Sequence, residues 1–347
     1  MDTGNPPLDA LADATAAPGA ARREDVPPRD RRWLALLGLV LLGVLVSRVG
    51  TEDLLARLRN LGWRAPLLAW PFALIAAIDG WAWSFTLPRG DGPRPGLPLL
   101  TMIRLAGESV NNLTPTAYLG GEPVKAMLLV DRGIDAAGGT VSVIVAKTAL
   151  TVGQVLFVLL GIVAALERFG VLRSGTLPVA LLCGLGALFT AWLVRIQQRA
   201  PIARAVGFGR RLGLHGPRFA RLAATAPRVD GELRSFYSVR GRDFAASTFL
   251  HFAGWLAGTL EMKVFADLVG LSLGWRDAFV IESLSQPLSA GAAIVPGALG
   301  IREAGGVAIF RVLGLDESAG LAIWILRRLR EALYSALGLA FLVARRR

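Results

Sequence analysis

The chain has almost none of the residues on which metal and redox sites are usually built. Its 347 residues include one cysteine and two histidines. Cys183 lies in the apolar run "LPVALLCGLGALF" and has no second thiol for an intramolecular disulfide or a thiolate metal site. His215 and His251 are too few for a zinc cluster or a histidine proton relay. The composition therefore predicts neither a metal site nor a cofactor.

Charged residues are also scarce. They make up 18% of the chain, against 53% hydrophobic residues, and the mean hydropathy is +0.51. Soluble globular domains carry about 25% charged residues, so the balance predicts an integral membrane protein. The net charge of +12 would suggest nucleic acid in a soluble chain, but here the arginines lie between apolar segments, where they set membrane orientation. We therefore expect no nucleic-acid partner.

Long apolar runs are present instead. A spanning helix needs about 20 mostly apolar residues, and six runs are candidates: about 33–49, 66–87, 138–166, 176–196, 243–270 and 318–343. Two further stretches, 97–131 and 276–314, are apolar but interrupted by proline, glycine, asparagine and charge. They are predicted to form broken helical hairpins, either re-entrant or fully crossing. The predicted fold class is an all-α polytopic membrane protein.

Composition also divides the chain. Residues 1–29, rich in Ala, Pro and Asp, predict a disordered tail, and residues 30–347 a single membrane domain. Arginines concentrate at 21–32, 88–98, 197–242 and the C-terminus, all on one side of the predicted topology. Positive loops face the cytoplasm, so both termini are predicted to be cytoplasmic. The basic segment 197–242 is either an interfacial helix on anionic lipid or a solvated loop.

One unusual stretch occurs twice. "PTAYLGGE" at 115–122 is matched by "PGALGIRE" at 296–303, 181 residues later. At the same offset, and without a gap, Gly133 meets Gly314, Asp135 meets Asp316, and Lys147 meets Arg328. These coincidences involve residue types that membrane segments normally avoid, so an internal repeat explains them better than composition does.

The repeat divides the membrane domain into halves at 33–166 and 176–343. Three crossings, an odd number, separate equivalent points, so the second half is predicted to be inverted relative to the first. Hairpin 97–131 then opens toward the cytoplasm and hairpin 276–314 toward the outside. Inverted repeats whose discontinuous segments meet near the midplane are the plan of many transporters.

Each break is a candidate binding feature, because irregular backbone at membrane depth survives only beside protein or a water-filled cavity. Glycines permit sharp turns and close approach of a substrate; they stand at positions Gly120, Gly121, Gly297 and Gly300. Helices starting near Glu122 and Glu303 would present free N–H groups to an anionic headgroup. Alternatively, these carboxylates cap their own helices.

Ionised residues also fall inside the spans. Lys147 lies within one, and Arg327, Arg328, Arg330 and Glu331 lie within the last. Each charge costs about 2.5–3.5 kcal/mol at the bilayer centre, so such residues face the bundle interior and have partners. In both halves a glutamate precedes a cation by 25 residues, which pairs Glu122 with Lys147 and Glu303 with Arg328.

These pairs have two interpretations. They are ion pairs that pin each hairpin to the next span, or the cations hold a lipid phosphate while the carboxylates complete a polar path or carry a coupling proton. The two interpretations are compatible with each other. Polar neighbours would widen the path: Glu108, Asn111, Asn112, Thr114, Thr148, Thr151, Gln154, Ser285 and Gln286. Asp79, Glu261 and Lys263 are predicted to play only a supporting role.

The segments "NNLTPTAYLGGEPVKAMLL", "VPGALGIRE" and "ILRRLREALYSALGLA" together resemble the lysylphosphatidylglycerol synthase transmembrane family of flippase-like proteins. The resemblance covers nearly all of 33–343, and general appearance suggests the branch associated with hopanoid biosynthesis. The motif positions that it implies are Asn112, Pro115, Gly120, Gly121, Glu122, Pro296, Gly297, Gly300, Glu303 and Arg327 or Arg328. The second motif departs from the family at Ala298, where a further glycine is common.

The resemblance implies a multi-pass protein of a bacterial inner membrane that handles lipid. In the full synthases a separate cytosolic domain performs aminoacyl transfer, and a chain ending in "LVARRR" is expected to lack it. We therefore predict a non-enzymatic transporter that moves an anionic or isoprenoid-derived lipid between leaflets. The alternative is an accessory protein that scaffolds membrane-bound lipid-biosynthesis enzymes. A membrane-embedded transferase is less favoured, because no nucleophile–base constellation is evident.

Overall fold

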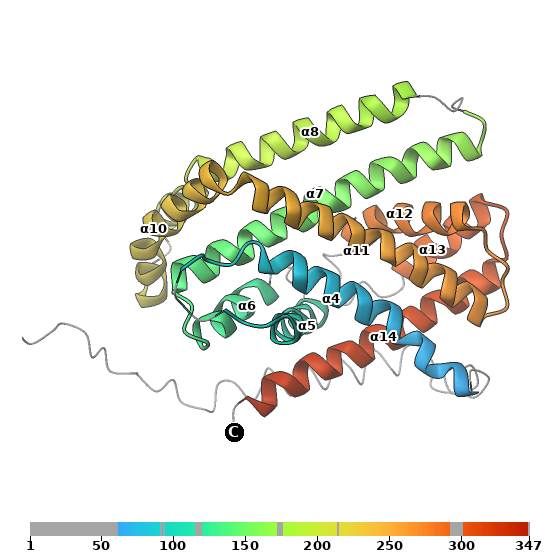
Figure 1. The fold of residues 1–347 in the computed structure, drawn as a ribbon, viewed down its shortest axis with the longest axis horizontal. Coiled ribbons are helices and arrows are strands. Elements are labelled where there is room, and N and C mark those ends of the chain that lie inside the picture. The colour runs from blue at the N-terminus through green and yellow to red at the C-terminus, as the bar shows by residue number, and fades with distance from the viewer. Residues whose placement is uncertain are drawn as a thin grey trace, which may run out of the picture.

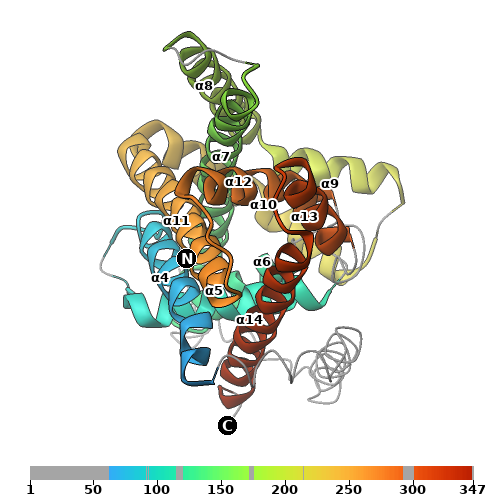
Figure 2. The ribbon, with the colours of Figure 1, turned by 90° about the vertical axis from the view of Figure 1, so that its right-hand side faces the viewer.

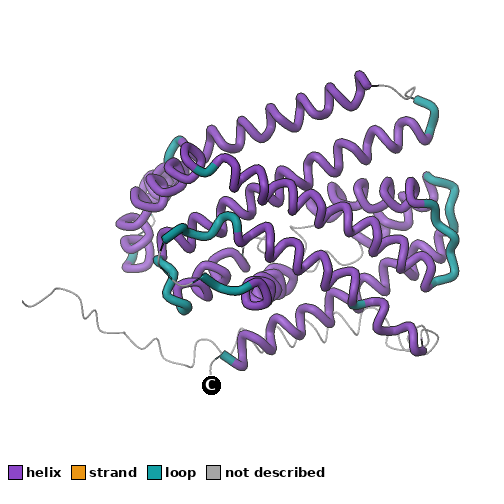
Figure 3. Tube along the Cα trace, viewed as in Figure 1, coloured by secondary structure: helices purple, strands orange, loops and turns teal. Residues whose placement is uncertain are grey.

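The computed structural model describes residues 62–345, except 91, 93, 115–119, 172–175, 214 and 292–300. Within these ranges the secondary structure is helical, without strands, and the helices are joined by short loops (Figure 3). The helices are η2 (Gly62–Leu68), α4 (Trp70–Ser84), α5 (Leu97–Leu113), α6 (Gly121–Val130), α7 (Ala136–Arg168), α8 (Thr176–Gln198), α9 (Pro201–Arg211), α10 (Pro217–Val239), α11 (Gly241–Leu268), α12 (Trp275–Gly291), α13 (Ile301–Val312) and α14 (Glu317–Ala344). The all-α prediction is confirmed.

Five of the six predicted spans coincide with helices α4, α7, α8, α11 and α14. The predicted span 33–49 and the tail 1–29 lie outside the described residues. Among those described, three segments are long and apolar enough to cross a membrane: Gly62–Ser84, Ala136–Arg168 and Ala180–Gln198. Helices α11 and α14 have 28 residues each but carry more ionised side chains, such as Glu261 and Arg327. The predicted number of spans therefore stays a prediction.

The two predicted hairpins are pairs of helices, α5 with α6 and α12 with α13. Helix α5 ends at Leu113 and α6 begins at Gly121, while α12 ends at Gly291 and α13 begins at Ile301. Most of the two predicted breaks, residues 115–119 and 296–300, lies outside the described residues. With 10 and 12 residues, α6 and α13 are about 15–18 Å long, which is too short for a bilayer core of about 30 Å.

The two halves run in opposite directions. In Figure 1, α4 runs from right to left and α11 from left to right, and α7 and α14 are opposed in the same way. Hairpin α5–α6 lies toward the left end of the bundle and hairpin α12–α13 toward the right. The order α4–α5–α6–α7 thus recurs, inverted, as α11–α12–α13–α14, as the internal repeat predicts.

Both hairpins end in the same turn. Gly133 and Gly314 have φ of 83° and 70°, a left-handed conformation that favours glycine. The next amide returns to the helix in each case, from Ile134 to Leu129 and from Leu315 to Phe310, which is the Schellman pattern. The following aspartates, Asp135 and Asp316, then cap α7 and α14. The Ser318 hydroxyl and amide hold the pKa of Asp316 below its ordinary value.

The basic segment 197–242 contains the helices α9 and α10, and whether it lies on anionic lipid stays a prediction. Helices α9 and α10 cover the left end of the bundle in Figure 1. Val229, Leu233 and Phe236 of α10 are buried in a cluster with Val141 and Val145 of α7. Helix α8, by contrast, lies at the periphery in both Figure 1 and Figure 2, and its large apolar side chains are mostly exposed.

Glycines allow the central helices to approach one another closely. A Cβ at Gly121 of α6 would lie 2.0 Å from the Gly107 carbonyl oxygen of α5. On α11, a Cβ at Gly254 would lie 3.0 Å from Asp79 and one at Gly258 would lie 3.0 Å from Glu282. The small residues of α11 therefore make room for two carboxylates that neighbouring helices bring to the centre.

Candidate functional site

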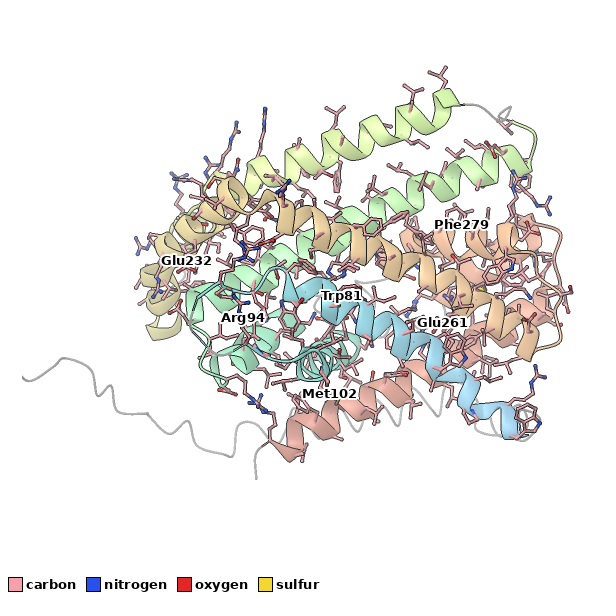
Figure 4. The ribbon with its side chains drawn as sticks, viewed as in Figure 1. Trp81, Arg94, Met102, Glu232, Glu261 and Phe279 are labelled. Atoms are coloured by element: carbon pink, nitrogen blue, oxygen red, sulfur yellow. The ribbon has the colours of Figure 1, made fainter. Side chains whose placement is uncertain are left out.

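A cavity of about 310 Å³ lies at the centre of the bundle, between the two hairpins. It is lined by α4, α5, α7, α11, α12, α13 and α14. Its wall contains five carboxylates and five cations: Asp79, Glu108, Glu261, Glu282, Glu331, Arg104, Lys147, Arg302, Arg327 and Arg330. Figure 4 shows one of them, Glu261, in the right half of the bundle, away from Arg94 and Glu232 at the left end. The formal charges of the wall balance.

Two arginines of α14 and two carboxylates form the best-buried part of the wall. Arg327 pairs with Glu282 of α12 and lies 3.7 Å from Glu261 of α11. Arg330 pairs with the same Glu261 at 3.0 Å. All four residues are at most 7% exposed. Buried charges of this kind are tolerated only when they are paired and hydrogen-bonded, so this group ties α11, α12 and α14 together.

A second group joins α13 to α14. Arg328 Nε lies 2.5 Å from Glu303 Oε1, and Arg328 also reaches Glu331 at 3.2 Å. Arg302 pairs with Glu331 at 2.9 Å. Glu331 therefore accepts from two arginines, one on its own helix and one on the hairpin.

The first half contains a corresponding group built around Asp79 of α4. Its two carboxylate oxygens have different partners, Arg104 of α5 at 2.5 Å and His251 Nδ1 of α11 at 2.7 Å. Asp79 and His251 are each 3% exposed. Their contact is at the close crossing of α4 and α11 at Gly254.

Lysines occupy the remaining part of this half. Lys125 of α6 pairs with Glu108 of α5 at 2.9 Å and with Glu122 at 3.2 Å. Lys147 of α7 lies 3.5 Å from Glu122 and lines the cavity, with 31% of its side chain exposed. Glu122 thus pairs with two lysines. The ion pair of Lys147 is longer and more exposed than those of Arg327 and Arg330 in the other half.

The two ion pairs predicted from the repeat are therefore formed, Glu122 with Lys147 and Glu303 with Arg328. Arg327, Lys147 and Asn112 line the cavity, whereas Arg328 pairs on the side of α14 that meets α13. Their role in substrate binding stays a prediction. Four other candidates, Pro115, Pro296, Gly297 and Gly300, lie outside the described residues.

The sharp turn predicted at the paired glycines is not formed at Gly120 or Gly121, while close approach of a substrate stays a prediction. Gly120 has φ −66° and ψ −27°, a right-handed conformation open to any residue, and Gly121 lies inside α6. Gly121 is required because α5 passes so close at Gly107. The helix start is also capped differently: Asn111 Oδ1 accepts from the Gly121 amide at 2.7 Å, while Glu122 turns to the lysines.

Sequence reasoning missed or undervalued several charged residues of the site. Arg104 and Glu282, which line the cavity, and Lys125, which pairs with Glu108, were not candidates. Asp79 and Glu261 were assigned a supporting role although both line the cavity. Lys263, in contrast, pairs with Asp267 at 2.5 Å away from the cavity. A usable signal was present in the hairpins, because each first arm carries polar residues four apart, Arg104 with Glu108 and Glu282 with Gln286.

An aromatic contact between α4 and α14 forms part of the cavity wall. The rings of Phe72 and Tyr334 lie 4.5 Å apart, and the Arg330 guanidinium lies 4.3 Å from the Phe72 ring centroid. The Tyr334 hydroxyl donates to the Ala69 carbonyl at 2.7 Å. Phe72, Tyr334 and Arg330 all line the cavity, so side chains form the wall at this position.

A family model for the lysylphosphatidylglycerol synthase TM region matches residues 33–338. The chain belongs to this family. It is therefore a membrane protein of a lipid-handling family, and the resemblance found in the sequence is confirmed. The hopanoid-associated branch stays a prediction. No curated protein and no solved structure matches the chain.

Proposed function

We propose that this member of the lysylphosphatidylglycerol synthase TM family moves an amphipathic lipid between membrane leaflets without chemically changing it. The observation that carries the proposal is the charged cavity at the centre of an apolar bundle, between two inverted hairpins. Ionised side chains are costly at membrane depth and mark substrate paths there. A path for a polar headgroup would explain why ten ionised side chains line this cavity.

The cavity suits a polar headgroup better than a whole lipid. A volume of about 310 Å³ is at the small end of ligand pockets, which span about 300–1,000 Å³. The headgroup would exchange existing ion pairs for its own, its phosphate contacting Lys147 or Arg327. Lys147 is the easier partner to recruit, because it lies 3.5 Å from Glu122 and is partly exposed.

The lipid tails would remain in the bilayer, between α4 and α14. On the cavity side this wall is formed by Phe72 and Tyr334. Leu74 of α4 and Leu333 and Leu337 of α14 are 40–46% exposed and would face the acyl chains. Separation of the two aromatic rings would connect the headgroup cavity with the hydrocarbon phase.

Alternating access follows from the inverted halves. Hairpins α5–α6 and α12–α13 lie toward opposite ends of the bundle, so movement of one hairpin would open the cavity to one side and movement of the other to the opposite side. The arginine-rich end, which carries α9 and α10, would face the cytoplasm by the positive-inside rule. Both termini are then cytoplasmic, in an inner membrane.

Lipid transport is tested by reconstituting the protein into vesicles that contain fluorescent phosphatidylglycerol. Dithionite bleaches only the outer leaflet, so transport appears as bleaching beyond half of the signal. We expect Glu261→Gln to abolish this excess and Lys263→Gln to leave it intact. The two positions are neighbours on α11, but Glu261 lines the cavity and Lys263 pairs with Asp267 outside it.

The variants also separate transport from a scaffolding role. The wild-type protein is tested with phosphatidylglycerol, phosphatidylethanolamine and a polyprenyl phosphate. If bleaching stops at half of the signal with all three lipids, the result contradicts the proposal and favours an accessory protein. Equal transport by wild type and Glu261→Gln would remove the cavity from the path.

A further inference from the structure

We propose that His251 is a proton-binding site that couples headgroup binding in the cavity to protonation, through a switch in the partners of Asp79. The proposal rests on the transport function proposed above and adds a coupling ion to it. Its basis is geometric. Asp79 lies between one cation that is always charged, Arg104, and one imidazole, a group that can accept a proton.

His251 has one ring nitrogen engaged and one available. Nδ1 lies 2.7 Å from Asp79 Oδ1, and among the described residues Nε2 has no hydrogen-bond partner although it is buried. With Nδ1 donating to the carboxylate, Nε2 carries the free lone pair and is the atom that accepts a proton. A carboxylate that accepts from Nδ1–H fixes the tautomer in this way.

A small cavity lies beside this histidine and shares charged lining residues with the central cavity. The small cavity has a volume of about 20 Å³, enough for about one water molecule. The charged groups that face it are Asp79 from α4, Arg104 and Glu108 from α5, Glu122 and Lys125 from α6, and Lys147 from α7. Asp79, Arg104, Glu108 and Lys147 also line the central cavity. A proton therefore has a short polar route from the headgroup site to His251.

The charges around Asp79 define the two states. With His251 neutral, Arg104 is the only full positive charge that contacts Asp79 among the described residues, at 2.5 Å. A proton from the aqueous cavity adds to Nε2, and imidazolium then neutralises Asp79 from the other oxygen. Arg104 is released from Asp79, and its planar fork is suited to bidentate contact with a phosphate.

The coupling has a definite sign. An anionic headgroup would bind more tightly when His251 is protonated, and by reciprocity headgroup binding would draw a proton onto His251. The phosphate and the proton would then move in the same direction across the membrane. Return of Arg104 to Asp79 would release both on the far side.

The chain offers a matched control, because its two histidines differ in setting. His215 is exposed, between α9 and α10, whereas His251 is buried against Asp79. We expect the affinity of micellar wild-type protein for short-chain phosphatidylglycerol to rise at least about fivefold between pH 7.5 and 5.5. The rise should persist in His215→Gln and disappear in His251→Gln, which keeps a hydrogen-bond donor but cannot change charge.

A second readout does not depend on transport or on a variant within the bundle. In ¹⁵N-histidine-labelled His215→Gln protein, the remaining imidazole signal reports His251 alone. It should change from neutral to protonated between pH 5 and 8, at a higher pH when short-chain phosphatidylglycerol is present. A His251 signal that does not titrate in this range, or titrates identically with and without the lipid, overturns the coupling.

The outcomes for the two proposals are distinguishable. Lipid transport by wild type in the vesicle assay, with an equal pH dependence in His251→Gln, would leave the transport function standing and reject the coupling. Absence of transport at pH 5.5 and at pH 7.5 would reject the transport function and the coupling with it. Proton uptake on adding short-chain phosphatidylglycerol near pH 7, present in wild type and lost in His251→Gln, supports the coupling.

Discussion

The two halves of the molecule share a helical plan but hold their charges differently. The second half pairs carboxylates with arginines, as in Arg327 with Glu282 and Arg330 with Glu261, and these side chains are at most 9% exposed. In the first half, Glu122 pairs with two lysines, Lys125 and Lys147. The Lys147 ammonium lies 3.5 Å from the Glu122 carboxylate, and 31% of the Lys147 side chain is exposed. A guanidinium makes several hydrogen bonds in a fixed plane, whereas an ammonium on a flexible stem does not.

This difference suggests a division of labour. The arginine group of the second half would fix helix positions, because each partner is buried and costly to leave alone. Lys147 of the first half would exchange partners at low cost, because its side chain is 31% exposed and its ion pair with Glu122 is long. Substitutions of charged residues in the second half should therefore lower stability as well as transport, whereas substitutions of the lysines in the first half should lower transport with little loss of stability. Three expected outcomes, ordered by their effect on the free energy of unfolding, test this contrast.

The largest effect is expected for Arg327→Gln. Loss of the guanidinium leaves Glu282 and Glu261 buried with one cation fewer, which should lower the free energy of unfolding by about 3–5 kcal/mol. Denaturation of the protein in mixed micelles measures this. The matched control is Arg311→Gln, which removes an exposed ion pair with Glu317 between α13 and α14 and should leave the unfolding midpoint unchanged. Equal effects of both variants would contradict the contrast.

An intermediate effect is expected for Gly121→Ala in the first half. The added Cβ would lie 2.0 Å from the Gly107 carbonyl oxygen, so α5 and α6 must separate, at a cost of about 1–3 kcal/mol. Gly231→Ala on α10 is the control, because nothing lies within 4 Å of a Cβ there. It should stabilise the helix by about 0.5–1 kcal/mol. Denaturation in mixed micelles compares the two variants. An unchanged free energy of unfolding in Gly121→Ala would show that α5 and α6 can separate without cost at this crossing.

The smallest effect on stability is expected for Lys147→Gln. Its ion pair is long and partly exposed, so its loss should change the free energy of unfolding by less than about 1 kcal/mol. The vesicle assay should nevertheless show roughly tenfold slower transport, which corresponds to about 1.4 kcal/mol of lost headgroup interaction. A variant that unfolds readily but transports at the normal rate per folded protein would reverse the proposed division.

Much of the architecture was predictable because membrane residence imposes strong constraints on sequence. An apolar run of about 20 residues has few alternatives to a helix, and five predicted spans match helices within a few residues at most ends. The repeat was also recognisable in the sequence, because the left-handed turns require glycine at Gly133 and Gly314 and because Asp135 and Asp316 cap the next helix. Those residue types have specific local geometries, so the sequence preserves them in both halves.

The charged residues of the site were only partly predictable. The ion pairs Glu122–Lys147 and Glu303–Arg328 were identified because the repeat marks them, but Arg104 and Glu282 do not correspond at the repeat offset. Their partners lie on other helices, Asp79 on α4 and Arg327 on α14, and the register of those contacts depends on helix crossings. Pairing between helices far apart in sequence is not encoded in local periodicity.

By itself, the sequence determined that this protein is a helical membrane protein built from two inverted halves, because hydrophobic length, turn residues and an internal repeat are local properties of the chain. Only the tertiary structure decided what those halves enclose. Close approach at Gly107, Gly254 and Gly258 brings five carboxylates and five cations to one cavity. It also places His251, a residue of no evident importance in the sequence, against Asp79, because the crossing of α4 and α11 sets which side chains meet.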